Sequence, residues 1–144
     1  MSGSESLAQR VMPLFGALYI GIGIIGFAFT SGFGSFLQNT DDYILIPGLS
    51  VNPFHNVVHL AIGGFLLIMS RQSTSTAEGA CLGVGIFYVA AFVIGVVGPT
   101  NLTIISMQGR GDLENVNHLL NGVVLLTLGL LSAAATDRRA PRTA

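Results

Sequence analysis

Four long apolar stretches alternate with shorter polar segments along the chain. They run from about Val11 to Phe29, Pro53 to Ser70, Ala80 to Gly98 and Leu113 to Ala135. Each has about the 20 residues that an α-helix needs to cross roughly 30 Å of hydrocarbon. Within them, only Glu114 is an Asp, Glu, Lys or Arg. The pattern therefore predicts four membrane-spanning helices.

The composition agrees with a lipid environment. Of the 144 residues, 51% are hydrophobic and 9% are charged, whereas roughly 25% are charged in soluble domains. The lone cysteine excludes an internal disulfide framework, and six scattered basic residues exclude a nucleic-acid footprint. The expected partner is the bilayer, not a nucleic acid, and other membrane proteins or a homo-oligomer are partners left open.

The arginines predict the orientation, because basic residues near the ends of spans stay on the cytoplasmic side. Five of the six basic residues lie on one side of the predicted bundle: Arg10, Arg71, Arg138, Arg139 and Arg142. We expect a protein of the cytoplasmic membrane with both termini in the cytoplasm. Residues 1–10 form the N-terminal segment and residues 136–144 a basic tail. A cleaved secretory signal in place of the first span is the alternative.

The second and fourth stretches share a motif. Asn56, Val57, His59, Leu60, Gly63, Leu66 and Leu67 recur 59 residues later as Asn115, Val116, His118, Leu119, Gly122, Leu125 and Leu126. Upstream, Gly16, Tyr19, Ile25 and Gly26 recur 69 residues later as Gly85, Tyr88, Ile94 and Gly95. These identities indicate two copies of a helical hairpin, at about 11–70 and 80–135. We predict an all-α bundle of four transmembrane helices made of two tandem parallel hairpins, related by an axis along the membrane normal.

Small residues four positions apart are typical of faces where membrane helices approach closely. Four such pairs occur: Ala17 with Gly21, Gly79 with Gly83, Ala91 with Gly95, and Gly129 with Ala133. We expect helix contacts at these pairs. At the outer face, Asn52 and Pro53 are expected to begin the second helix and Asp112 to cap the fourth. Tyr43 to Ile46 is expected to pack at the interface, with a short interfacial strand or a partner-binding lip as the alternatives.

The repeated motif carries a family resemblance. The segment from Asn52 to Leu60, followed by Gly63, and its echo from Glu114 to Leu119, followed by Gly122, share Asn-x-x-His-Leu-x-x-Gly. From about Arg10 to Ala135 the chain resembles an uncharacterised bacterial family of small four-helix membrane proteins catalogued as domain of unknown function 4383. The second copy has Glu114 where a smaller acidic residue is commoner, which keeps the charge. The resemblance implies a fold and a membrane location and no established activity.

The motif also places polar side chains on one face of each of these two helices. That polar motif comprises Asn56, His59, Gly63, Asn115, His118 and Gly122. Residues three or four apart share a helix face, and polar groups within a span face the bundle interior by default. In the first interpretation, the asparagine and histidine pairs hydrogen-bond across the twofold axis and hold the hairpins in register. We therefore expect a small structural or accessory membrane component with no cofactor, not an enzyme.

In two alternative interpretations, the histidines bind a metal or haem, or they line a path for protons or small solutes. His55 and His59 have the i, i+4 spacing of metal ligands, and His118 with Glu114 could complete a site for a divalent metal. For haem, His59 and His118 are the obvious axial pair. Alternatively, the histidines and Glu114 form a proton or small-solute path, although no acidic group lies deep in a span. Cys81 has no histidine close by in the predicted topology, so we expect it to pack rather than to react.

Overall fold

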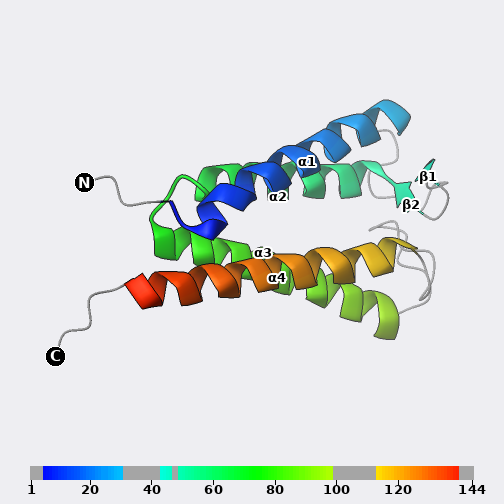
Figure 1. Ribbon diagram of the computed structural model, residues 1–144. Helices are drawn as coiled ribbons and strands as arrows, with labels where there is room; N and C mark the ends of the chain where they lie inside the picture. Colours follow the sequence, from blue (N-terminus) through cyan, green and yellow to red (C-terminus); the bar gives the residue numbers. More distant parts are fainter. Residues whose placement is uncertain (1–4, 31–42, 47–48, 99–112, 140–144) are drawn as a thin grey trace.

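The computed structural model describes residues 5–30, 43–46, 49–98 and 113–139. Within these ranges the chain forms the helices α1 (Leu7–Phe29), α2 (Pro53–Met69), α3 (Thr74–Val97) and α4 (Leu113–Arg139). A short antiparallel ribbon, β1 (Tyr43–Ile46) with β2 (Leu49–Val51), precedes α2. The helices pair as α1 with α2 and α3 with α4 (Figure 1). The predicted all-helical bundle of two hairpins is confirmed.

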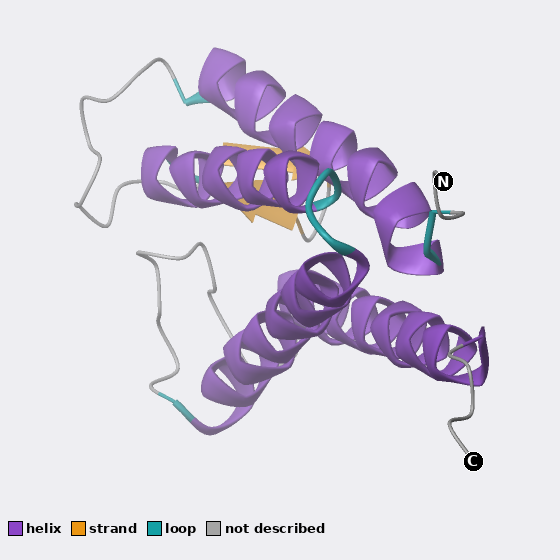
Figure 2. Ribbon diagram, turned by 90° about the vertical axis from the view of Figure 1, so that its left-hand side faces the viewer, coloured by secondary structure: helices purple, strands orange, loops and turns teal. Residues whose placement is uncertain are grey.

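Both hairpins point the same way. The start of α1, the turn between α2 and α3 and the end of α4 lie at one end of the bundle, and the starts of α2 and α4 lie at the other (Figure 1). Viewed from the side, the hairpins form two layers that are joined by the turn at residues 70–73 (Figure 2). The same polar motif, near the start of α2 and of α4, is thus brought to the same depth in both layers.

Three helices, α1, α3 and α4, are long and apolar enough to cross a membrane. Helix α2 is shorter: its 17 residues rise roughly 26 Å at 1.5 Å per residue. Large apolar side chains point outward along the bundle, with Leu14 and Val97 each 72% exposed. Such exposure of side chains on long apolar helices suits contact with lipid rather than water.

Polar residues cap α1 and α3 at positions that precede the apolar stretches. Ser6 caps α1 in a capping box: its Oγ accepts from Gln9 N at 3.3 Å, and Gln9 Oε1 accepts from Ser6 N at 2.8 Å. Ser73 caps α3 with a single bond, in which its Oγ accepts from Thr76 N at 3.3 Å. Because these caps satisfy N–H groups that a helix leaves unbonded, α1 and α3 start several residues earlier than hydrophobicity indicated. The predicted start of α2 at Asn52 and Pro53 is confirmed, while Asp112 lies outside the described residues.

Glycines allow the two helices of each hairpin to touch backbone to backbone. A Cβ on Gly16 would lie 2.9 Å from Gly63 O, and one on Gly63 would lie 2.7 Å from Gly16 O. In the second hairpin, a Cβ on Gly122 would lie 3.1 Å from Gly85 O. These four glycines occupy corresponding positions of the two copies identified in the sequence. The two hairpins therefore close on the same contact.

The small-residue pairs expected from spacing are a poorer guide. Among the described residues, nothing lies within 4 Å of the place where a Cβ on Gly21, Gly79 or Gly83 would stand, so these glycines do not form a close helix contact there. Gly129 does pack closely, against Leu82. The expectation was wrong at those three glycines because a four-residue spacing identifies a face and not the direction in which it points.

Two adjacent glycines of α2 allow a direct test of the backbone contact. Gly63→Ala is expected to lower the free energy of unfolding by about 1–3 kcal/mol, because the added Cβ collides with a backbone oxygen that cannot rotate away. Gly64→Ala meets nothing and is expected to be neutral or to stabilise by up to about 1 kcal/mol through helix propensity. Unfolding of the detergent-solubilised protein, followed by circular dichroism, measures both. Equal stability of the two variants would contradict the assigned contact.

Candidate functional site: a buried histidine cluster between the hairpins

Five aromatic rings close a circuit at the centre of the bundle. Tyr19 of α1 lies against His59 of α2, with ring centroids 5.7 Å apart, and against Tyr88 of α3, at 5.5 Å. Tyr88 lies 5.8 Å from His118 of α4. His55 of α2 completes the circuit, at 4.6 Å from His59 and 6.2 Å from His118. Every helix contributes, so the circuit joins the two hairpins.

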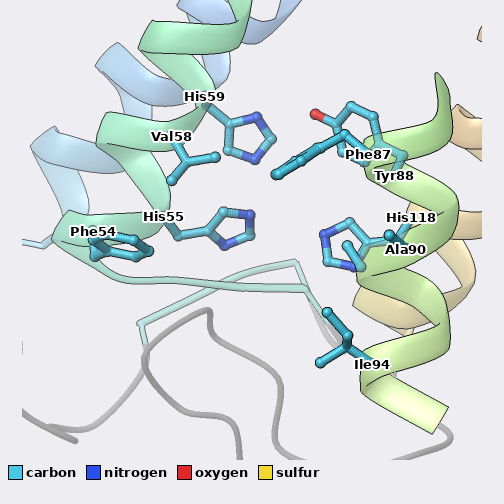
Figure 3. Close-up of a pocket in the computed structure, with 10 residues that line it drawn as sticks. Phe54, His55, Val58, His59, Phe87, Tyr88, Ala90, Ile94 and His118 are labelled. Atoms are coloured by element: carbon cyan, nitrogen blue, oxygen red, sulfur yellow. The ribbon is translucent and has the colours of Figure 1, made fainter. Parts of the chain in front are cut away.

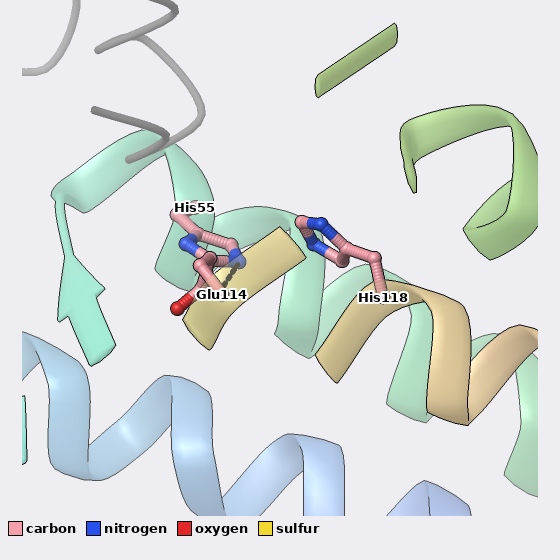
Figure 4. A group of neighbouring side chains, drawn as sticks. All are labelled: His55, Glu114 and His118. Atoms are coloured by element: carbon pink, nitrogen blue, oxygen red, sulfur yellow. Dashed lines mark ion pairs between the residues drawn. The ribbon is translucent and has the colours of Figure 1, made fainter. Parts of the chain in front are cut away.

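A smaller group within this region has the chemistry of metal ligands. His55, Glu114 and His118 each offer one ligand atom, and these atoms lie within 4.8 Å of one another. His55 Nε2 is 3.4 Å from Glu114 Oε1 (Figure 4). The three residues are only 5–6% exposed. A carboxylate and two imidazoles from different hairpins thus converge away from solvent.

The structure separates His59 from the other predicted ligands. His59 is buried and stacks on His55, but it is not a member of the close ligand group. The Nδ1 atoms of His55, His59 and His118 are all buried, and none has a hydrogen-bond partner among the described residues. Three neighbouring imidazoles therefore each keep one unused nitrogen.

Haem does not fit between His59 and His118. His55 packs its ring on that of His59 and also faces His118, while the two tyrosines pack against the other sides of the pair. A porphyrin placed between these two imidazoles would have to displace His55 and break the circuit of rings. The arrangement suits a single ion better than a macrocycle.

The asparagines of the motif are buried, but the bond shown for Asn56 differs from the expected one. Asn56 Nδ2 donates to Thr30 Oγ1 at 3.3 Å, and Thr30 ends α1 of the same hairpin. The Asn56 side chain also lies against Gly26, where a Cβ would collide with it. This hydrogen bond therefore lies within one hairpin and not across the axis.

The two tyrosines of the circuit had no predicted role, although both occur among the repeated residues. Tyr19 Oη donates to Asn121 Oδ1 of α4 at 2.6 Å. Tyr88 corresponds to Tyr19, but the position corresponding to Asn121 is Ile62, which cannot accept a hydrogen bond. Tyr88 Oη is accordingly buried without a hydrogen-bond partner among the described residues. The repetition of the tyrosines in the sequence could have indicated a role for them. The sequence repeat could not show that their hydroxyl groups have different surroundings.

A cavity of about 390 Å³ adjoins the histidines, between α2 and α3. Its lining consists of Phe54, His55, Val58, His59, Phe87, Tyr88, Ala90, Ala91, Ile94 and His118 (Figure 3). The three histidines and the tyrosine project into this space from α2, α3 and α4 (Figure 3). Apart from them, its lining is apolar.

A second polar cluster holds the hairpins together at the other end of the bundle. Ser132 Oγ of α4 accepts from Ala8 N at 3.0 Å and donates to Glu78 Oε1 at 2.8 Å. Thr136 Oγ1 also donates to Glu78 Oε1, at 2.7 Å. Ser132 therefore links the first turn of α1, whose N–H groups have no partner within the helix, to a buried carboxylate of α3. Cys81 is fully buried with its Sγ 3.4 Å from Leu125 O, in keeping with packing.

Removing the Ser132 hydroxyl tests this link. Ser132→Ala is expected to lower the free energy of unfolding by about 1–3 kcal/mol, because Ala8 N and Glu78 each lose a buried hydrogen-bond partner. Thr127→Ala, an exposed site on the same helix, is expected to have little effect. Thermal unfolding in detergent compares the two, and a loss no greater than that of the control would contradict the link.

The fold and the cluster together define a class: a small all-helical protein with membrane-type helices and a buried, histidine-rich contact between two hairpins. A family model described as Domain of unknown function (DUF4383) matches residues 9–131. The chain therefore belongs to this family, as its repeated motif indicated. No curated protein and no solved structure matches it.

Proposed function

We propose that this protein is a multi-pass protein of the cytoplasmic membrane that binds a divalent transition-metal ion between its two hairpins. The observation that carries the proposal is the convergence of His55, Glu114 and His118, each buried and each offering one ligand atom within 4.8 Å of the others. Two imidazoles and one carboxylate are a known ligand set for zinc sites that keep an open position.

The distances between the three ligand atoms support binding of an ion such as Zn²⁺. Zinc holds nitrogen and oxygen ligands at about 2.0–2.2 Å, so adjacent ligands of a tetrahedral site lie roughly 3.4 Å apart. His55 Nε2 and Glu114 Oε1 are already 3.4 Å apart. The widest spacing in the group, within 4.8 Å, requires His118 to approach by up to about 1.4 Å. A modest rotation of that side chain would complete three-ligand coordination.

The charge balance supports the same proposal. A carboxylate that is removed from water is costly unless a positive charge compensates for it. Glu114 is a buried acidic residue beside the circuit, and the imidazole of His55, 3.4 Å from its carboxylate, is charged only when protonated. Imidazole binds metals in its neutral form, so an ion would supply positive charge without protonating the histidines.

A structural or accessory role is the second candidate. It is favoured by the His55 contact with Glu114 and the circuit of rings, both of which join one hairpin to the other. In this case the cluster would fix how the hairpins meet, and no ion would be needed. Polar contacts in membranes contribute about 0.6 kcal/mol each on average, so their role would be specificity rather than bulk stability.

Metal binding distinguishes the candidates. The purified wild type is expected to retain one equivalent of Zn²⁺ after dialysis, and Co²⁺ to give the visible absorption of a four-coordinate site. Glu114→Gln and His118→Ala each remove a ligand and are expected to weaken binding roughly 100-fold or more. His59→Phe keeps the ring contacts and lies outside the ligand group, so it is expected to retain the metal.

The opposite pattern would favour the structural candidate. It consists of a wild type that retains no Zn²⁺ or Co²⁺, together with a loss of thermal stability in His118→Ala. Retention of a full equivalent by both Glu114→Gln and His118→Ala would contradict the proposed ligands directly.

The proposal includes a topology and an origin. Helix α2 would be the fourth crossing, since 17 residues lie at the lower end of the lengths that span a bilayer. Both termini would then be cytoplasmic, with the arginines on the inner side. The corresponding glycine, tyrosine and histidine contacts of the hairpins support an internal duplication.

Cysteine accessibility tests the topology. In a Cys81→Ser background, Arg71→Cys lies in the exposed turn between the hairpins, and Leu113→Cys lies exposed at the start of α4. A membrane-impermeant maleimide added to intact spheroplasts is expected to label only Leu113→Cys, and Arg71→Cys only after permeabilisation. The reverse labelling would show the inverted orientation, and labelling of both sites in intact spheroplasts would show that α2 or its neighbours do not cross as proposed.

A further inference from the structure

We propose that the cavity between α2 and α3 binds a small, planar, uncharged molecule from the bilayer whose ring carries carbonyl oxygens, the chemistry of a quinone. The inference goes beyond metal binding, because it depends on the shape of the cavity and on Tyr88, which is not a member of the metal-ligand group. Four properties of the cavity lead to it.

The first property is the size and lining of the cavity. Its volume is about 390 Å³, within the range of about 300–1,000 Å³ typical of ligand pockets and equal to roughly thirteen water volumes. Phe54 and Phe87 contribute flat apolar surfaces, and the imidazoles and the phenol contribute further rings. Such a lining favours a planar ring that stacks on its neighbours.

The second property is the opening of the cavity. Phe87 and Ile94 line it and are about half-exposed on the outer surface of α3. That surface belongs to a helix that is long and apolar enough to cross a membrane. Lipid would cover this surface, and a ligand that enters the cavity past Phe87 and Ile94 must dissolve in the bilayer.

The third property is an unsatisfied donor. Tyr88 Oη is buried, lines the cavity and has no hydrogen-bond partner among the described residues. In Figure 3 its oxygen points toward the side of the cavity where His59 lies. A buried hydroxyl without a partner is costly, and a carbonyl oxygen of a ligand would satisfy it. A hydrocarbon would leave it unsatisfied.

The fourth property is the neighbouring acid, which selects against charged amphiphiles. Glu114 is buried beside His55, which also lines the cavity. In the metal-free protein, a fatty-acid carboxylate would bring a second negative charge into the same low-dielectric region, where like charges repel strongly. A neutral ring ketone accepts the hydrogen bond from Tyr88 without that penalty.

The corresponding space between α1 and α4 lacks these properties. It measures about 260 Å³, and the tyrosine that lines it, Tyr19, already donates to Asn121. Ile22 stands there at the position that corresponds to Ala91 of the larger cavity. The two spaces therefore differ in volume and in whether the tyrosine hydroxyl already has a hydrogen-bond acceptor. Residues of the smaller space supply matched controls.

Equilibrium dialysis against the full chain in lipid nanodiscs tests the proposal with three probes. These are menadione, a naphthoquinone; 2-methylnaphthalene, which has the same ring frame without oxygens; and decanoate, a charged acyl chain. Menadione is expected to bind with one site per chain and at least about tenfold more tightly than 2-methylnaphthalene, because only menadione accepts the hydrogen bond. Equal binding of the two ring compounds, or tighter binding of decanoate, would overturn the assignment.

Substitutions locate the site. Tyr88→Phe is expected to weaken menadione binding about tenfold without reducing thermal stability, since the hydroxyl it removes has no partner. Ala91→Ile, which installs the residue found at the corresponding position, is expected to fill the cavity and abolish binding. Ile22→Ala, at the corresponding position of the other space, is expected to leave it unchanged. Unchanged affinity in both Tyr88→Phe and Ala91→Ile would overturn the proposal.

These variants distinguish loss of metal binding from loss of menadione binding. Glu114→Gln is expected to lose the ion and keep menadione, whereas Ala91→Ile is expected to keep the ion and lose menadione. A wild type that binds menadione but no metal would overturn the proposed function alone, and the converse would overturn this inference alone.

Discussion

Hydrocarbon offers no hydrogen-bond partner, and the rest of this structure depends on how the chain meets that constraint. Polar side chains near the starts of α2 and α4 have to face protein, and the histidines and Glu114 among them lie where the hairpins meet. The glycine contacts make that placement possible. Gly63 lies one helical turn after His59 and touches the backbone of α1 at Gly16, which fixes both the depth and the direction of the histidine. Gly122 has the same relation to His118 through Gly85.

The parts of the structure that could be predicted are those that local patterns determine. Runs of apolar residues located the helices, Asn52 and Pro53 marked a start, and the repeated motif identified the two hairpins. The direction in which a helix face points is a property of the assembly. For that reason a four-residue spacing singled out Gly21, whose added Cβ would meet none of the described residues, while the close contact at Gly16 was visible only as a repeated residue.

The candidate site shows the same division. The histidines were predicted to be buried because imidazoles within apolar helices are costly in lipid, and all three are. Which of them meet could not be predicted, since His59 and His55 share one helix face and only the packing of α4 brings Glu114 to His55 and not to His59. The buried link of Ser132 to Glu78 was missed because its partners are 54 residues apart and share no motif.

The cluster also gives a physical reason for carrying both hairpins in one chain. His55 and Glu114 occupy corresponding positions of the two hairpins, and they meet where the hairpins face each other. Two identical hairpins would place histidine against histidine there, or carboxylate against carboxylate, and buried like charges repel. A single chain with unequal halves can place an acid against a base.

The same freedom accounts for the unequal spaces beside the cluster. Asn121 satisfies Tyr19 on one flank, while Ile62 leaves Tyr88 unsatisfied on the other, and the larger cavity lies on the unsatisfied side. His55 and His118 line that cavity as well. An ion held by these imidazoles and Glu114 would therefore lie beside the cavity, so the departures from symmetry bring the two proposed sites side by side.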